Sequence, residues 1–163
     1  PTHEDLEVEL RSIFGRSPDE PLPDLSLFPP EIFEFESPPG TYFDAFPLLL
    51  LTSATLGRLQ KLAPASRVDV RRFRPNLLIT TPDGVEDFAE LGWVGKRLRI
   101  GEVELSVPAA CPRCVMISHG FDDLPKDPGL IRTVVREANQ NVGVYGSIER
   151  AGRIAVGDAV ELL

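Results

Sequence analysis

The pattern of apolar and polar residues predicts short strands with a few helices over most of the chain. Pro47–Leu51 is a continuous apolar run, which is typical of a strand buried on both faces. Leucines at helical spacing follow it, in a helix that Thr52 or Ser53 can cap and that Pro64 ends. Further strands are predicted at Val68–Phe73, Asn76–Thr80, Asn141–Ile148 and Ile154–Leu163.

The clearest hairpin joins Arg97–Ile100 to Val103–Val107 across a Gly-Glu turn. It leads directly to the two cysteines, Cys111 and Cys114. A helix is predicted from Asp127-Pro128 to Ala138, because Asp can cap a helix that Pro begins. These elements together predict a mainly β fold, an antiparallel, barrel-like domain with a few short peripheral helices.

The N-terminal part differs from the rest of the chain. Thr2–Asp5 matches a capping box, and apolar residues at helical spacing follow it up to Gly15, so a short amphipathic helix is expected. Seven prolines then lie between Pro18 and Gly40 and predict an extended surface segment, in which only Glu31–Glu36 could pair as a strand.

Composition and charge narrow the class of protein. The 163 residues suit one domain, and the net charge of −8 argues against binding to nucleic acid or to anionic membranes. No apolar run is long enough to span a membrane, and no signal segment opens the chain. These features predict a soluble, cytoplasmic protein.

The strongest chemical signal is Cys111-Pro-Arg-Cys114. Such a pair serves dithiol redox chemistry, half of a zinc site, or a single thiolate that binds a metal or attacks a substrate. The β-favouring Val115–Ile117 argues against the helix start of redox proteins, and only His3 and His119 could complete a zinc site besides carboxylates. A thiolate favoured by Arg113 therefore remains as a ligand for a transition metal, and a pair of inert buried thiols is the alternative.

An arginine-rich segment about forty residues upstream adds a second signal. Arg71, Arg72 and Arg74 gather there in an acidic protein, and the simplest interpretation of the first two is surface ion pairing. With the cysteines, this segment forms an ordered series of motifs: Arg72-Phe-Arg-Pro-Asn76, Glu86-Asp87, Trp93-Val-Gly95, Ile100-Gly101, Cys111-Pro-Arg-Cys114 and Val156-Gly-Asp158.

This series resembles the MOSC domain, the module named after the C-terminal domain of molybdenum cofactor sulfurases and shared with the mitochondrial amidoxime-reducing component. The resemblance runs from about Gly40 to Leu163 and implies a MOSC-type β-barrel over residues 40–163. Residues 1–39 are then the N-terminal helix and a Pro-rich segment packed on the barrel. Nothing in them resembles the N-terminal barrel of two-domain family members.

The resemblance also implies a cofactor, the molybdenum cofactor (molybdopterin). It implies Cys114 as the ligand to molybdenum, with Cys111 as the second candidate. Arginines suit the phosphate end of such a cofactor, because a guanidinium grips phosphate with two parallel hydrogen bonds. The residues expected to bind the cofactor are Arg74, Asn76, Asp44, Tyr145 and Arg113.

Three classes of function follow from this resemblance. The first is a stand-alone MOSC protein that reduces N-hydroxylated small molecules or transfers sulfur, with a separate electron donor or sulfur donor protein. The second is a non-catalytic carrier of cofactor or sulfur, and the third is a β-barrel with inert thiols. The first two predict that Cys114, Arg74, Asn76 and Tyr145 line one pocket at one end of the barrel.

Overall fold

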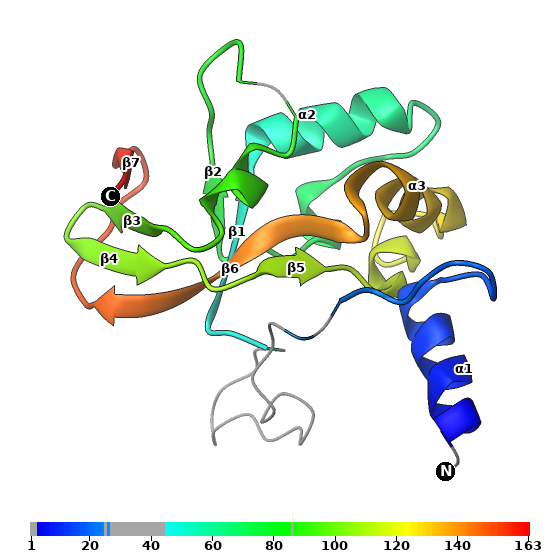
Figure 1. The fold of residues 1–163 in the computed structure, drawn as a ribbon. Helices are drawn as coiled ribbons and strands as arrows, with labels where there is room; N and C mark the ends of the chain where they lie inside the picture. The colour runs from blue at the N-terminus through cyan, green and yellow to red at the C-terminus, as the bar shows by residue number, and fades with distance from the viewer. Residues whose placement is uncertain (1–2, 25, 27–44, 86) are drawn as a thin grey trace.

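A curled sheet carries the fold, which the computed structural model describes for residues 3–24, 26, 45–85 and 87–163. Its strands are β1 (Leu48–Thr52), β2 (Leu77–Ile79), β3 (Arg97–Ile100), β4 (Val103–Ser106), β5 (Ala110–Pro112), β6 (Asn141–Arg150) and β7 (Val160–Leu162). They follow the order β2-β1-β6-β4-β3-β7, and β5 pairs with β6 off this path. Figure 1 shows the sheet curling into a half-barrel with helices at its periphery. The mainly β, barrel-like fold is therefore confirmed.

One strand pair departs from the antiparallel pattern. β1 and β2 run parallel, with Leu50 opposite Leu77, so the sheet is mixed. Parallel neighbours need a crossover connection, which helix α2 (Ser53–Leu62) supplies. Thr52 ends β1 and caps α2, because its hydroxyl accepts a hydrogen bond of 3.2 Å from the backbone N–H of Thr55.

Two segments with β-favouring residues, the predicted strand Val68–Phe73 and the segment after the cysteines, for which no helix start was expected, are short 3-10 helices instead. The predicted strand Val68–Phe73 is wrong: η2 (Val70–Arg72) occupies it, and the Asp69 carboxylate caps η2 by accepting a 3.0 Å hydrogen bond from the backbone N–H of Arg71. The segment after the cysteines is likewise η4 (Val115–Ser118). In both places a helical turn buries apolar side chains in the core, and this packing outweighs intrinsic β propensity.

The hairpin of β3 and β4 forms as predicted. Ile100 and Val103 are paired across a two-residue turn, in which Gly101 takes a φ of 54° that favours glycine. The C-terminal strand is shorter than the predicted Ile154–Leu163, because only β7 pairs, with β3.

The helices pack on the sheet through apolar faces. Helix α3 (Pro128–Ala138) starts as predicted, where the Asp127 carboxylate accepts a 3.2 Å hydrogen bond from the backbone N–H of Leu130. Apolar residues of α2 and α3 share one core cluster, and residues of β3, β4 and β6 form a second one with the short helix η3 (Ala89–Trp93). No helix of the described segments has the length and apolar character to cross a bilayer.

A carboxylate lies inside the core at η3. Glu90 is fully buried, and its Oε2 accepts hydrogen bonds of 2.6 Å from the hydroxyls of Thr52 and Thr55. Its Oε1 has no hydrogen-bond partner within the described part of the chain. Glu90 thus links η3 to the junction of β1 and α2.

The predicted N-terminal helix is α1 (His3–Phe14), and its C-terminal end is anchored on the domain. The side-chain amide of Gln140 donates to the carbonyl of Phe14 at 2.8 Å, and Arg132 donates to the carbonyl of Gly15 at 2.9 Å. Both Nη atoms of Arg132 also donate to the carboxylate of Glu20. These bonds, together with one from the backbone N–H of Ser17, lower the pKa of Glu20 to about 2. The predicted strand Glu31–Glu36 lies outside the described residues, and the division at residue 39 stays a prediction.

Candidate functional site

The two cysteines lie in different environments, although both are thiols. Cys111 lies on β5, where the pairing with β6 shifts register between Ala110 and Pro112. The residue is 3% exposed and packs in a cluster with Tyr145. Cys114 is only partly buried, directly before η4. The structure therefore presents Cys114 as the more accessible thiol.

This difference predicts selective alkylation. Iodoacetamide should modify Cys114 in the native protein and Cys111 only after unfolding, because a reagent must reach the sulfur. The Cys111→Ser and Cys114→Ser variants, labelled separately and analysed by mass spectrometry, would assign each reaction. If Cys111 reacted first, or if both thiols resisted until unfolding, Cys114 would not be the accessible thiol.

Tyr145 and Asn76 are brought together by β1. Tyr145 lies on β6 opposite Leu49, and its backbone N–H donates to the carbonyl of Ala109 (2.9 Å), just before β5. Asn76 precedes β2 and binds Leu49 twice: its Oδ1 accepts from the Leu49 N–H (2.8 Å), and its own N–H donates to the Leu49 carbonyl (2.9 Å). The cysteine strand, Tyr145 and Asn76 thus occupy neighbouring positions across the sheet.

Arg74 has an unusual backbone for its residue type. Its φ is 53°, in the left-handed region that L-residues other than glycine avoid at a cost of about 1–2 kcal/mol. It is exposed, and within the described segments its guanidinium forms no ion pair or hydrogen bond. A strained backbone that presents an unpaired cation is a feature typical of binding sites.

Arg113 points inward rather than toward solvent. The residue is 9% exposed, its Nε donates to the carbonyl of Val142 at 2.8 Å, and its guanidinium lies 5.5 Å from the centre of the Phe73 ring. Its Nη2 is buried without a hydrogen-bond partner in the described part of the chain. Arg113 thus connects the cysteine motif to the Arg-Phe-Arg segment.

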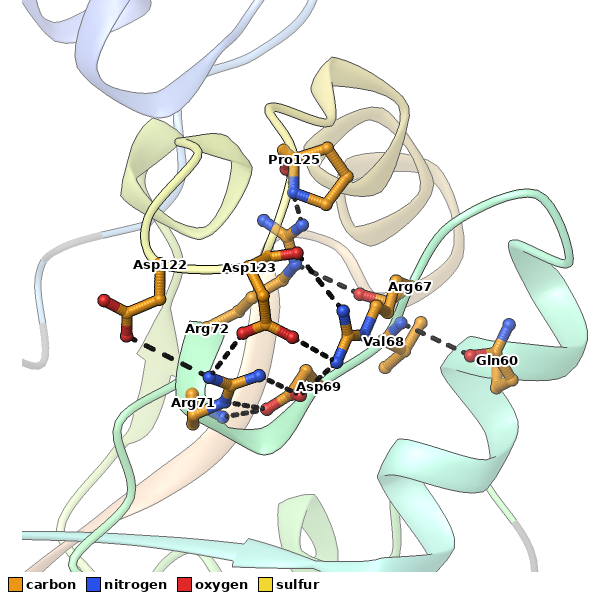
Figure 2. Close-up of polar contacts among 9 residues, drawn as sticks. All are labelled: Gln60, Arg67, Val68, Asp69, Arg71, Arg72, Asp122, Asp123 and Pro125. Carbon is orange, nitrogen blue, oxygen red and sulfur yellow. Dashed lines mark hydrogen bonds and ion pairs between the residues drawn. The ribbon is translucent and has the colours of Figure 1, made fainter.

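Arg71 and Arg72, which look alike in the sequence, have different environments (Figure 2). Arg71 forms the predicted surface ion pairs, with Asp69 and Asp123 at 2.9 Å, and its hydrogen bonds lower the pKa of Asp69 to about 2. The prediction is wrong for Arg72, which is buried and bound to backbone carbonyls. Sequence reasoning also missed Gln140, a fully buried residue whose side-chain amide donates to the Arg113 carbonyl.

The pocket predicted to join Cys114, Arg74, Asn76 and Tyr145 stays a prediction. Asp44, expected at the end of a loop that touches the cofactor, lies outside the described residues. A separate open pocket of about 250 Å³ lies on α2 and contains none of the predicted site residues. It is lined by Ala54, Gly57, Arg58, Lys61, Val85 and Asp87.

Comparisons with known proteins find one family model and a set of relatives. A family model described as "MOSC domain" matches residues 39–161. The chain is 33% identical over 132 residues to human "Mitochondrial amidoxime reducing component 2" and 30% identical over 132 residues to the bovine protein of that name. Each match covers 73% of this chain but only 38% of the relative. "Molybdenum cofactor sulfurase 2" of Culex quinquefasciatus is 37% identical over 78 residues, which cover 47% of this chain and 10% of that protein.

Proposed function

This chain belongs to the MOSC domain family, and on that premise we propose that it binds molybdenum cofactor, with the Cys114 thiolate toward the metal and Arg74 toward the phosphate. The observation that carries the proposal is the sheet order β5-β6-β1-β2. It makes the cysteine strand, Tyr145 and Asn76 neighbours, although they are distant in the sequence. The names of the relatives, which include a molybdenum cofactor sulfurase, support the same cofactor.

The residues present fit such a group. A thiolate is a soft ligand for a transition metal, and Cys114 is a free cysteine that is only partly buried. Among the described residues, no three His, Cys, Asp or Glu side chains gather to hold a metal ion, so a metal at Cys114 would need further ligands from a bound group. The exposed side chain of Arg74 is a donor suited to an anionic ligand, and so is the buried Nη2 of Arg113, which has no hydrogen-bond partner among the described residues.

The reaction we propose is the reduction of an N-hydroxylated compound. When bound, the cofactor supplies a redox-active molybdenum centre. The overall change joins R₂N–OH, two electrons and two protons to give R₂NH and water. The electrons would come from a donor outside these 163 residues, because the sequence has no dinucleotide-binding glycine motif and its two cysteines are too few for an iron–sulfur cluster. The residues of this chain hold and orient the cofactor.

A carrier function is the second candidate, and the exposure of Arg74 favours it. A carrier must release its ligand to a partner, and a phosphate held by an exposed side chain is easier to release than one held in a closed cavity. In that case Cys114 would hold the cofactor or a sulfur atom for transfer to a separate enzyme.

Cofactor retention tests the proposal. Protein purified from a host that makes molybdenum cofactor should contain molybdenum and pterin. Arg74→Ala should weaken retention about tenfold or more, because a charge-assisted hydrogen bond contributes about 1.5–3 kcal/mol. Molybdenum would be measured by mass spectrometry and pterin by fluorescence after oxidation.

The matched control for this test is Arg153→Ala. Arg153 is also exposed, and its side chain likewise forms no ion pair in the described segments, but it lies in the connection between β6 and β7. Retention should be unchanged in this variant. Wild-type protein without molybdenum or pterin, or an equal loss in both variants, would contradict the proposed site.

A further inference from the structure

Arg72 is a buried cation that no carboxylate of the described residues pairs with. The residue is 3% exposed, and burying a charge is costly unless hydrogen bonds replace its hydration. Within the described residues, its guanidinium donates only to backbone carbonyls: those of Arg67 (3.0 Å), Ile117 (3.1 Å), His119 (3.1 Å) and Pro125 (2.7 Å). Figure 2 shows the bonds to Arg67 and Pro125. Arg72 therefore links η2 to the segment that follows the cysteine motif.

Two of the carbonyls that Arg72 binds lie at the C-terminal end of η4, the short helix that directly follows Cys114. Cys114 is the N-cap of η4 and His119 is its C-cap, and Ile117 lies in its last turn. The last carbonyls of a helix lack partners within it, and a cation there satisfies them. Because η4 spans only four residues, fixing its end also restricts Cys114.

Phe73, the residue after Arg72, contacts the residue before Cys114. Phe73 is buried, and its ring lies under the guanidinium of Arg113, the residue before Cys114. Arg74 then turns outward with a positive φ. Arg72 thus contacts the chain after Cys114, and Phe73 contacts the chain before it. Arg74 presents the exposed cation.

Surface ion pairs join the same two segments but contribute less. Arg67 and Arg71 bind Asp123 at 2.7 and 2.9 Å, with side chains between 42% and 56% exposed (Figure 2). Ion pairs at such exposure are weak because water screens them. The buried Arg72 is the connection expected to fix the geometry.

We propose that Arg72 is a positioning residue, which sets where the Cys114 thiol lies relative to the Arg74 guanidinium. This inference rests on the proposed function, in which those two groups hold opposite ends of one ligand. Arg72 itself touches neither the ligand nor the reacting atoms. It acts through η4 and through its own neighbour, Phe73.

The first experiment needs no cofactor. In Arg72→Lys the charge remains but the planar fork is lost, so η4 should open more often. The rate of Cys114 alkylation by iodoacetamide should rise about tenfold or more, while the rate at buried Cys111 should stay unchanged. Arg71→Lys, an exposed neighbour, should change neither rate. Equal acceleration at both cysteines, or none, would overturn the proposal.

The second experiment uses cofactor dissociation as its readout. The effect of Arg72→Lys on the dissociation rate should vanish in a Cys114→Ser background, because no thiolate is left to position. Equal effects in both backgrounds would mean that Arg72 acts only through stability. If the wild type binds no cofactor, the proposed function fails, and the alkylation rates still decide the role of Arg72.

Should Arg72→Lys fail to fold, hydrogen exchange of the wild type decides. The amides of Arg72 and Phe73 and those of Ile117 and His119 all bond within their own short helices. If Arg72 joins η2 and η4 into one unit, these amides should exchange with one common opening free energy. Separate opening free energies for the two helices would overturn the proposal.

Discussion

Cys114→Ala, loaded with molybdenum cofactor, is expected to lose measurable reduction of a hydroxylamine or N-oxide substrate. The change removes the proposed thiolate ligand of the metal, whereas Cys111→Ala removes a buried sulfur from a core cluster and should keep the activity. Turnover would be followed with a viologen donor, and the molybdenum content of both variants would be measured. Loss of activity in Cys111→Ala alone would move the ligand assignment to Cys111.

The same assay separates the enzyme from the carrier. The enzyme should turn over only when a chemical donor or a separate reductase is present, because no electron-transfer motif is found in the sequence. A carrier would show no turnover with any donor but would restore the activity of an enzyme that lacks cofactor. The two outcomes exclude each other for a single loaded preparation.

The elements that were predicted correctly have their signals close together in the sequence. Thr52 and Asp127 cap α2 and α3 through side-chain oxygens that a sequence displays directly. The hairpin of β3 and β4 needs only a two-residue turn with glycine between alternating segments. In each case the interactions that fix the element span a few residues, so the sequence pattern was sufficient.

The elements that were predicted wrongly depend on distant contacts. Val68–Phe73 has β-branched residues in a strand-like pattern, but Arg72 and Phe73 are drawn into contacts with the region around Cys114, about forty residues later. The parallel pairing of β1 and β2 likewise depends on how α2 packs back on the sheet. Local propensity carries no information about either.

In the candidate site, too, local features were predicted from the sequence and features that depend on distant contacts were not. The residue types at Cys114, Arg74 and Asn76 could be read from the sequence, since each carries recognisable chemistry. The buried position of Arg113 could not, nor could the difference between Arg71 and Arg72. Adjacent arginines differ only in which way the backbone turns them, and that direction is set by the tertiary fold.

Gly143→Ala is expected to destabilise the protein strongly at the centre of this region. Gly143 lies on β6 with a φ of 82°, and a Cβ there would lie 2.8 Å from the backbone carbonyl oxygen of Leu50 and 3.6 Å from Nη2 of Arg113. A backbone carbonyl within a sheet cannot move aside easily. Strain at positive φ and steric overlap each cost about 1–3 kcal/mol, so the midpoint temperature of thermal unfolding should fall by about 5–15 °C.

Gly57→Ala is the matched control for this prediction, because it makes the same chemical change in open space. Gly57 lies in α2 and is exposed, and no atom lies within 4 Å of a Cβ placed there. Alanine is the better helix former, so this variant should gain about 0.5–1 kcal/mol. Calorimetry of both variants would give the unfolding temperatures. Equal unfolding temperatures for the two variants would show that β6 can shift to accept a side chain at Gly143. The close packing of β6 against β1 beside Arg113 would then not constrain the site.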